Sequence, residues 1–427
     1  MYKLFQLLFF TFLVYSTNFS QKIPVPVNGC YHAAFVPGES GGHQGFENLA
    51  QKTLAIEMNF FSWSNVPDFP LSACNGIIQA GSTPHITWEP WNGNMNSTQF
   101  SNQAIISGNY DAFIARWAAA AKSFGKPLFL RWGHEMNGNW YPWDGTHSGG
   151  KTTTDFGDPA KADGPERYIA AYRHIYHIFD SLKVNNITWV WCPNYSSSPN
   201  EEWNKAESYY PGDDVVDWIG VDGYNFGTSQ SWSSWTKFIS IYNSFYNTFK
   251  PYGKPIMIGE YACTEVGGSK SQWITDAYTY TKLLFPQIKA ITWFNINKET
   301  DWRINSSDLA LQAYKKAIAD PYFLGKIVTD VKQDNSLPLN YLVLSAFPNP
   351  FNPGTSISYN LPESSHVRLR IFDILGNQIT ILTDEIKAAG THKVNFDASK
   401  FNLVSGVYLC CLQAGGKTTT FKIIFQK

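Results

Sequence analysis

The stretch PLFLRWGHEMNGNWYPW, Pro127–Trp143, decides the fold of this chain. Its first six residues are mostly apolar and follow a lysine, which is typical of a strand buried in a parallel sheet. The stretch then turns abruptly through GHEMNG (133–138) into a group of aromatic residues. A carboxylate at the end of a buried strand costs free energy unless it is paired. Glu135 is therefore either a structural ion-pair partner of Arg131 or His134, or a functional acid.

Length and composition narrow the class of protein. A chain of 427 residues is long enough for one large domain and one small one. Its formal net charge of -1 gives no electrostatic reason to expect a nucleic acid or an anionic membrane as partner. The content of 16 Trp, 23 Tyr and 30 Phe is unusually high, and packing of the core is its simplest explanation. Such an excess also suits a protein that binds carbohydrate, because the apolar faces of sugar rings stack on aromatic side chains.

The N-terminus has the pattern of a secretory signal peptide. One lysine precedes an apolar run from Leu4 to Tyr15, which is too short to span a bilayer, and small residues follow at Ser16 and Ser20. We expect residues 1–20 to be the signal peptide. No later stretch is long and apolar enough for a transmembrane segment. The sequence therefore predicts an exported protein, secreted or held at the cell surface.

The six cysteines follow no zinc-binding or redox spacing. An exported protein can pair some of them, and the sequence leaves the pairing open. Cys410 and Cys411 are adjacent in an expected strand, so their side chains point to opposite faces and are poor partners for each other.

Strand-like and helix-like segments alternate along residues 21–320. The expected strands are Gly29–Phe35, Leu54–Trp63, Pro84–Trp88, Leu128–Trp132, Ile187–Trp191, Val216–Val221, Pro255–Gly259 and Ala290–Phe294. The clearest expected helices are Tyr110–Phe124, Pro165–Lys183, Trp232–Phe249, Gln272–Leu284 and Ser307–Ile318. Eight strands alternating with helices predict an α/β fold, a (β/α)8 TIM barrel. A doubly wound open sheet is the rival, but no glycine-rich phosphate loop follows the first strand.

Two glutamates follow strands that lie apart in the predicted barrel. Glu135 follows the fourth strand, and Glu260 ends the seventh in KPIMIGEYACTE. Catalytic groups of barrel enzymes lie at the carboxyl ends of the strands, where side chains from separate strands face each other. Two carboxyl groups about 5–5.5 Å apart would form the acid/base and nucleophile of a retaining glycosidase.

The chain changes character after the predicted barrel. Residues 321–341 show no clear period and are interpreted as a linker. Residues 342–427 alternate at period two between Asn-Pro, Leu-Pro and Gly-Asn turns, which predicts a small all-β, immunoglobulin-like sandwich.

The two glutamate motifs resemble glycoside hydrolase family 26, a family of β-mannanase-like barrel enzymes, over about residues 24–320. The most specific part is RWGHEMNGNWYPW (131–143), supported by VDGYN (221–225) and WFN (293–295). The resemblance implies that Glu135 is the general acid/base and Glu260 the nucleophile, with retention of anomeric configuration. It also matches His134 to the histidine that the family carries directly before its acid/base.

The resemblance extends to substrate-binding positions. It implies that Tyr224 lies against the nucleophile and that Trp293 forms the floor of the central sugar subsite. Arg131 is a further candidate for a contact to the nucleophile or the substrate, and His134 is a candidate either to orient Glu135 or to contact a sugar hydroxyl. Four tryptophans at or just past strand ends are each as suited to packing as to stacking on sugar: Trp88, Trp91, Trp140 and Trp143.

The substrate implied by the resemblance is a β-linked polysaccharide, with two alternatives. Endo-β-1,4-mannanase is the first expectation, because it is the commonest activity of the family. Many mannanases of the family carry a Phe-Trp-Trp run after the acid/base, whereas this chain has Trp140-Tyr141-Pro142-Trp143. The Tyr-Pro-Trp form looks more like members that act on other β-glycans, so mixed-linkage β-1,3-1,4-glucanase is the alternative.

The C-terminal segment resembles the sorting domain of the type IX secretion system. The resemblance covers about residues 342–427 and rests on FPNPFNP, IFDILGN and SGVYL. It implies that the type IX machinery is a partner and carries the protein across the outer membrane. A carbohydrate-binding module is less favoured, because the segment contains no tryptophan.

Two other classes of function are less favoured for the predicted barrel. A non-catalytic polysaccharide-binding barrel would be expected to lack one of the two glutamates, and both are present. A metal-dependent hydrolase would need clustered ligands, whereas His174 and His177 fit one face of a helix. We therefore expect no metal and no cofactor in the reaction.

Overall fold

The computed structural model describes residues 22–328, 343–361, 363–373 and 376–427. The chain divides between residues 329 and 330 into two compact units. The predicted signal peptide, residues 1–20, lies outside the described residues, as does the part of the predicted linker from residue 329 to residue 341. Among the described residues, no helix has the length and apolar character that crossing a membrane requires.

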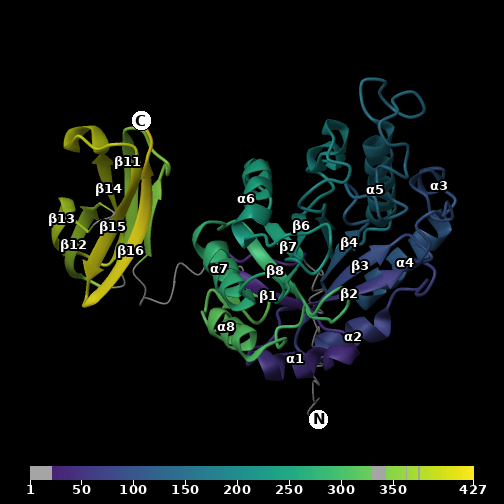
Figure 1. The fold of residues 1–427 in the computed structure, drawn as a ribbon, viewed down its shortest axis with the longest axis horizontal. Coiled ribbons are helices and arrows are strands. Elements are labelled where there is room, and N and C mark those ends of the chain that lie inside the picture. The colour runs from purple at the N-terminus through teal and green to yellow at the C-terminus, as the bar shows by residue number, and fades with distance from the viewer. Residues whose placement is uncertain (1–21, 329–342, 362, 374–375) are drawn as a thin grey trace, which may run out of the picture. The chain divides into compact units, whose positions relative to one another are not determined.

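The first unit is a closed barrel of eight parallel strands with helices outside it (Figure 1). The strands follow the order β2-β3-β4-β5-β6-β7-β8-β1, and β1 pairs with β2 to close the barrel. Their bounds are β1 Cys30–Phe35, β2 Ile56–Ser62, β3 Thr83–Glu89, β4 Leu128–Trp132, β5 Ile187–Trp191, β6 Trp218–Asn225, β7 Ile256–Cys263 and β8 Ile288–Phe294. The predicted (β/α)8 barrel is confirmed.

An α-helix follows most of these strands; two lie between β3 and β4, and two short 3-10 helices stand in for one between β5 and β6. The α-helices are α1 Gly42–Ala50, α2 Leu71–Gln79, α3 Asn102–Ile106, α4 Asp111–Phe124, α5 Asp163–Ser181, α6 Phe238–Phe249, α7 Lys270–Leu283 and α8 Asp308–Ile318. The sequence predicted α4 to α8 and missed α1 to α3. The three missed helices are short, and both α1 and α2 contain glycine, which has a low helix propensity.

Strands β6 and β7 run four residues further than the sequence predicted. The predicted ends were Val221 and Gly259, whereas the structure continues each strand to Asn225 and Cys263. The register between the two strands shifts at Val221/Asp222, which marks a local irregularity. As a result Asp222, Tyr224 and Glu260 project from strands rather than from loops.

Packing closes the barrel at its amino-terminal end. Side chains from alternate strand positions form a cluster inside the barrel, and the buried Ile23 belongs to it. The backbone N–H of Ile23 donates to Thr188 Oγ1 at 2.8 Å. This face is therefore filled by apolar side chains, and the open end of the barrel is the carboxyl end of its strands.

The chain leaves the barrel through a short ninth strand, β9 Phe323–Leu324, which pairs with the start of β1. Phe323 is buried, and the carbonyl of Tyr322 accepts a hydrogen bond from the Cys30 backbone at 2.8 Å. Residues 321–328 of the segment predicted as a linker therefore belong to the packed barrel unit.

The second unit consists of two antiparallel sheets with their own apolar core. One sheet has the order β10-β11-β14 and the other β13-β12-β15-β16. The bounds are β10 Val343–Phe347, β11 Gly354–Leu361, β12 Ser365–Phe372, β13 Gln378–Lys387, β14 Gly390–Asp397, β15 Gly406–Ala414 and β16 Lys417–Phe425. Cys410 is buried and its neighbour Cys411 is half-buried on the other face of β15, as predicted. All six cysteines are free thiols in this structure.

Candidate active site

A cavity of about 950 Å³ opens at the carboxyl end of the barrel. Every strand, or the loop directly after it, contributes a side chain to the lining: Phe35, Phe60, Glu89, Glu135, Asn194, Tyr224, Glu260 and Phe294. Both predicted catalytic glutamates therefore face the same cavity. Its lining is mainly aromatic with a few acidic groups, which is the composition of a small-molecule or glycan site.

Glu135 is held at the cavity wall by the backbone and by one indole. Its φ of +54° lies in the left-handed region, which is uncommon for a residue other than glycine and is concentrated at functional sites. The Glu135 N–H donates to the Cys192 carbonyl at the end of β5, at 2.8 Å. Trp140 Nε1 donates to Glu135 Oε2 at 2.7 Å. These bonds fix the carboxyl group in a single orientation.

Burial, and after it the negative charge of Glu260, raise the pKa of Glu135 to about 8. The bond from Trp140 acts in the opposite direction because it favours the ionised form. The Glu135 carboxyl group is therefore protonated at neutral pH, which is the state that a general acid requires.

Glu260 is surrounded by hydrogen-bond donors. Tyr224 donates to its Oε2 and the Arg131 guanidinium to its Oε1, each at 2.5 Å. Burial and the charge of Glu260 raise the pKa of Tyr224 well above its usual value, so the phenol remains a donor. The bond from the guanidinium is charge-assisted. The two glutamates therefore lie in contrasting environments within one cavity.

Arg131 is fully buried beneath the cavity and links two carboxylates. Its Nη1 donates to both oxygens of Asp222 at 2.9 and 2.8 Å, while its Nη2 reaches Glu260. Thr87 Oγ1 accepts two further bonds from the guanidinium, at 3.0 and 2.8 Å. Arg131 was predicted both as a donor to Glu260 and as a substrate contact. It does donate to Glu260, but it is fully buried and is not part of the cavity lining.

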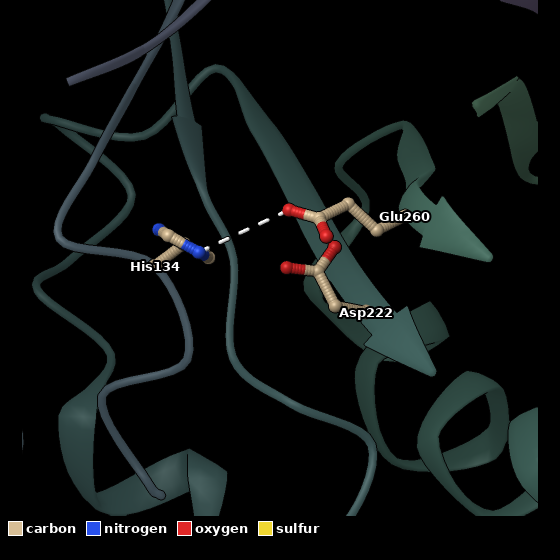
Figure 2. A group of neighbouring side chains, drawn as sticks. All are labelled: His134, Asp222 and Glu260. Carbon is tan, nitrogen blue, oxygen red and sulfur yellow. Dashed lines mark ion pairs between the residues drawn. The ribbon is translucent and has the colours of Figure 1, made fainter. Parts of the chain in front are cut away.

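His134 lies between the loop after β4 and Glu260. Figure 2 shows it beside Asp222 and Glu260, with 3.9 Å between its Nε2 and Glu260 Oε1. Burial and the charge of Arg131 lower the pKa of His134 well below its usual value, so the imidazole is neutral. It is buried and does not line the cavity, so its position favours a contact with Glu260 over one with a substrate.

His134, Asp222 and Glu260 also form the type of donor set that can hold a metal ion (Figure 2). Their nearest donor atoms lie within 4.8 Å of one another. Both carboxylates of the set already accept hydrogen bonds from Arg131. The guanidinium is therefore the cation that these two carboxylates share, and it supplies the charge that a metal ion would otherwise bring.

The loop after β4 is tied to its neighbours by side-chain bonds. Trp143 Nε1 donates to the His134 carbonyl at 2.8 Å, and Tyr141 stacks on Trp143 with 4.2 Å between ring centroids. Asn137 exchanges two bonds with the backbone of Asn194, at 2.9 and 2.8 Å. These contacts hold the segment that carries Glu135 against the segment after β5.

The predicted aromatic contacts divide into two groups. Trp91 and Trp140 line the cavity, as does Tyr224. Trp88, Trp143 and Trp293 are fully buried and are not part of the lining. Trp88 stacks on Trp117 in the layer between barrel and helices, and Trp293 Nε1 donates to the Trp302 carbonyl at 2.9 Å. These three indoles therefore support the site from behind and do not offer a face to a sugar.

Several lining residues were missed by the sequence analysis: Glu89, Tyr195, Phe226, Trp232, Lys298 and Trp302. Glu89 ends β3, so its position after a buried strand was a signal that could have found it. Burial, and after it the negative charge of Glu260, raise the pKa of Glu89 to about 7. Asp222 was also missed, although it lies in the quoted VDGYN segment.

Comparison with known proteins agrees with the fold. The family model described as glycosyl hydrolase family 26 matches residues 58–250, and the one described as a secretion system C-terminal sorting domain matches residues 345–426. An endo-β-1,4-mannanase structure from Cellulomonas fimi covers 93% of this chain and 94% of its own, at 15% identity and a TM-score of 0.53. At that identity the structural likeness establishes the fold alone.

Two curated relatives share part of the chain. Endoglucanase H of Acetivibrio thermocellus is 38% identical over 283 residues, which is 66% of this chain and 29% of the relative. A mannan endo-1,4-beta-mannosidase of Bacillus subtilis is 26% identical over 173 residues, which is 39% of this chain and 42% of the relative. The chain thus spans less than half the length of either protein. It contains a domain that belongs to glycosyl hydrolase family 26, followed by a secretion system C-terminal sorting domain.

Proposed function

We propose that this protein is a retaining endo-β-glycanase, with Glu135 as general acid/base and Glu260 as nucleophile. The observation that carries the proposal is the contrast between two glutamates that line one cavity. Glu135 has a pKa raised to about 8, whereas Glu260 accepts hydrogen bonds from Arg131 and Tyr224. Pairs of carboxyl groups in contrasting environments are the pattern of glycoside hydrolysis.

The reaction proceeds in two displacements. Glu135 donates its proton to the glycosidic oxygen while Glu260 attacks the anomeric carbon, which releases the leaving chain and forms a glycosyl ester. The ester removes the negative charge of Glu260, one of the causes that raise the pKa of Glu135. Glu135, now deprotonated, takes a proton from water, and the resulting hydroxide attacks the anomeric carbon and frees Glu260. Two inversions give overall retention.

We propose a glucan containing β-1,4 linkages, mixed-linkage β-glucan included, as the first substrate. The sequence favoured mannan first, with mixed-linkage glucan as the alternative. The longer and closer match to Endoglucanase H reverses that order. The Tyr141-Pro142-Trp143 run supports the reversal, because Tyr141 lines the cavity and would meet the substrate. Linear β-mannan remains the second candidate, supported by the mannosidase relative.

Product analysis tests the proposal. The purified protein should release oligosaccharides from mixed-linkage β-glucan faster than from linear β-mannan, and proton NMR should show the β-anomer as the first product. Glu135→Ala and Glu260→Ala should each lower kcat by several orders of magnitude while circular dichroism remains unchanged. Glu202→Ala is the matched control, because Glu202 is exposed and lies far from Glu135 and Glu260 in the sequence.

Three results would contradict parts of this proposal. Faster release from mannan would restore the first expectation from sequence. An α-anomer as first product would exclude retention. Binding without hydrolysis of either polysaccharide would favour a non-catalytic polysaccharide-binding barrel.

We also propose that the protein is exported and then secreted or held at the cell surface. Support comes from the sorting domain at residues 345–426, which implies the type IX machinery as a partner. The signal peptide expected at residues 1–20 fits the same route.

A further inference from the structure

Trp232 is exposed, whereas the other tryptophans are buried or half-buried. All 16 tryptophans lie in the described part of the chain, and Trp232 alone falls among the exposed residues, with 71% of its surface accessible. An indole left in water forgoes the free energy that its burial would contribute. Trp232 nevertheless belongs to the lining of the active-site cavity. Its exposure therefore places a flat apolar face at the rim of that cavity.

The segment that carries Trp232 is held in place. It belongs to the loop between β6 and α6, where Asn225 Oδ1 accepts bonds from Gly227 N at 3.1 Å and Thr236 N at 2.9 Å. Ser233 Oγ donates to the Gly227 carbonyl at 2.8 Å. The Thr228 N–H donates to the carbonyl of Val266 in the next loop, at 3.1 Å. The loop is thus fixed on both sides of Trp232, and the exposed indole is part of a built surface.

Aromatic rings connect Trp232 to the nucleophile. Tyr224, which donates to Glu260, lies 5.9 Å from Phe226 between ring centroids, and Phe226 lies 4.9 Å from Trp232. Trp302 packs beside this row, 5.2 Å from Tyr224 and 4.9 Å from Phe226. The row therefore runs outward from the reacting centre along one wall of the cavity.

Polar groups lie beside the row. Lys298 and Glu299 line the same cavity and form an ion pair at 2.9 Å. Gln230, in the Trp232 loop, donates through Nε2 to the Glu299 carbonyl at 3.2 Å. An aromatic face flanked by hydrogen-bonding groups can bind the apolar face of a sugar ring while its hydroxyl groups find polar partners.

We propose that Trp232, with Phe226 behind it, forms an outer sugar-binding subsite for a β-linked glycan chain. The inference rests on the proposed glycanase function and adds a place where the chain binds away from the bond that is cleaved. A sugar unit over Glu260 lies at the inner end of the aromatic row, and a unit further along the chain reaches its outer end. Trp232 should therefore matter more as the glycan becomes longer.

The first test compares substrates of different length. For Trp232→Ala, the ratio of kcat/KM on a β-1,4-linked hexasaccharide to that on a trisaccharide should fall roughly fivefold, the effect of losing one aromatic stacking contact. Trp232→Phe keeps a flat ring and should restore most of the ratio. Trp203→Ala is the matched control, because Trp203 is half-buried, donates to Glu201 at 2.9 Å and is not part of the lining. It should leave the ratio unchanged.

The second test observes Trp232 directly. In the inactive Glu260→Ala background, a saturating hexasaccharide should protect tryptophan fluorescence from acrylamide quenching. The protection should be largely lost when Trp232→Phe is added. Equal ratios for Trp232→Ala and the unchanged protein, or protection that does not depend on Trp232, would overturn the subsite. An unchanged protein that hydrolyses no β-glycan would instead overturn the proposed function.

Discussion

At the scale of single residues, the same type of side chain is placed in two different environments. Glu135 meets one indole donor and little water, so its neutral form is favoured. Glu260 accepts hydrogen bonds from a guanidinium and from a phenol. Asp222 accepts two bonds from Arg131 and so helps to hold the guanidinium against Glu260. Sequence alone could name the two glutamates, but only the folded structure distinguishes their environments.

The pH dependence of activity follows from the Glu135 pKa of about 8. A general acid is active when protonated, so kcat/KM should fall as the pH rises through about 8, about tenfold for each further pH unit. The measurement is a pH profile on soluble β-glucan, with fluorescence at each pH to confirm that the protein stays folded. If activity instead began to fall near pH 4.5, the ordinary pKa of a glutamate, Glu135 would not be the general acid.

At the scale of elements, the loop after β4 depends on one glycine. A Cβ added at Gly138 would lie 2.5 Å from an atom of the Trp140 indole, too close for either group to remain in place. Gly138→Ala should therefore displace Trp140 from Glu135 and lower kcat/KM roughly fivefold, because the carboxyl group loses the hydrogen bond that orients it, worth about 1 kcal/mol. Because the Trp140 bond lowers the pKa of Glu135, its loss should move the basic limb to higher pH.

The control for this change is Gly45→Ala in α1. A Cβ at Gly45 meets nothing within 4 Å, and alanine favours helix, so activity should be unchanged and stability equal or slightly higher. If Gly138→Ala kept the kcat/KM and the pH profile of the unchanged protein, Trp140 would not act through Glu135.

Helices and strands were predicted well where the local sequence pattern determines them, and less well where burial in the fold determines them. The long apolar runs predicted all eight barrel strands and the five clearest helices. The ends of β6 and β7 were placed too early, because Asp222, Tyr224 and Glu260 are polar but remain in strands. Equally, nothing in the sequence distinguishes the buried Trp88 from the exposed Trp232. The exposure of each indole is fixed by contacts between segments distant in the sequence.

At the scale of the whole molecule, the chain consists of two units with separate apolar cores. The barrel unit contains every residue that lines the active-site cavity. The second unit has a core of its own, from Phe351 to Phe425, and matches the sorting domain. The proposed catalysis and the proposed export therefore belong to different parts of the chain, and deleting the second unit should affect only export.

A truncation series tests this division. A chain ending at residue 328 keeps β9 and should retain the kcat and KM of the full chain on β-glucan. In a host with the type IX machinery it should remain cell-associated. A chain ending at residue 320, the predicted end of the barrel, loses the buried Phe323 and the bond between Tyr322 and Cys30. Its free energy of unfolding should fall by about 3 kcal/mol or more, the usual effect of removing a buried phenylalanine.

Urea unfolding and kinetics of the two truncated chains separate the outcomes. Loss of activity in a folded chain ending at residue 328 would show that the second unit contributes to the substrate site. Equal stability of the two chains would show that β9 is dispensable, and the barrel would then end at residue 320 as the sequence predicted. The expected result is that β9 closes the barrel unit, because its pairing with β1 satisfies the Cys30 backbone N–H at the rim of the closed end.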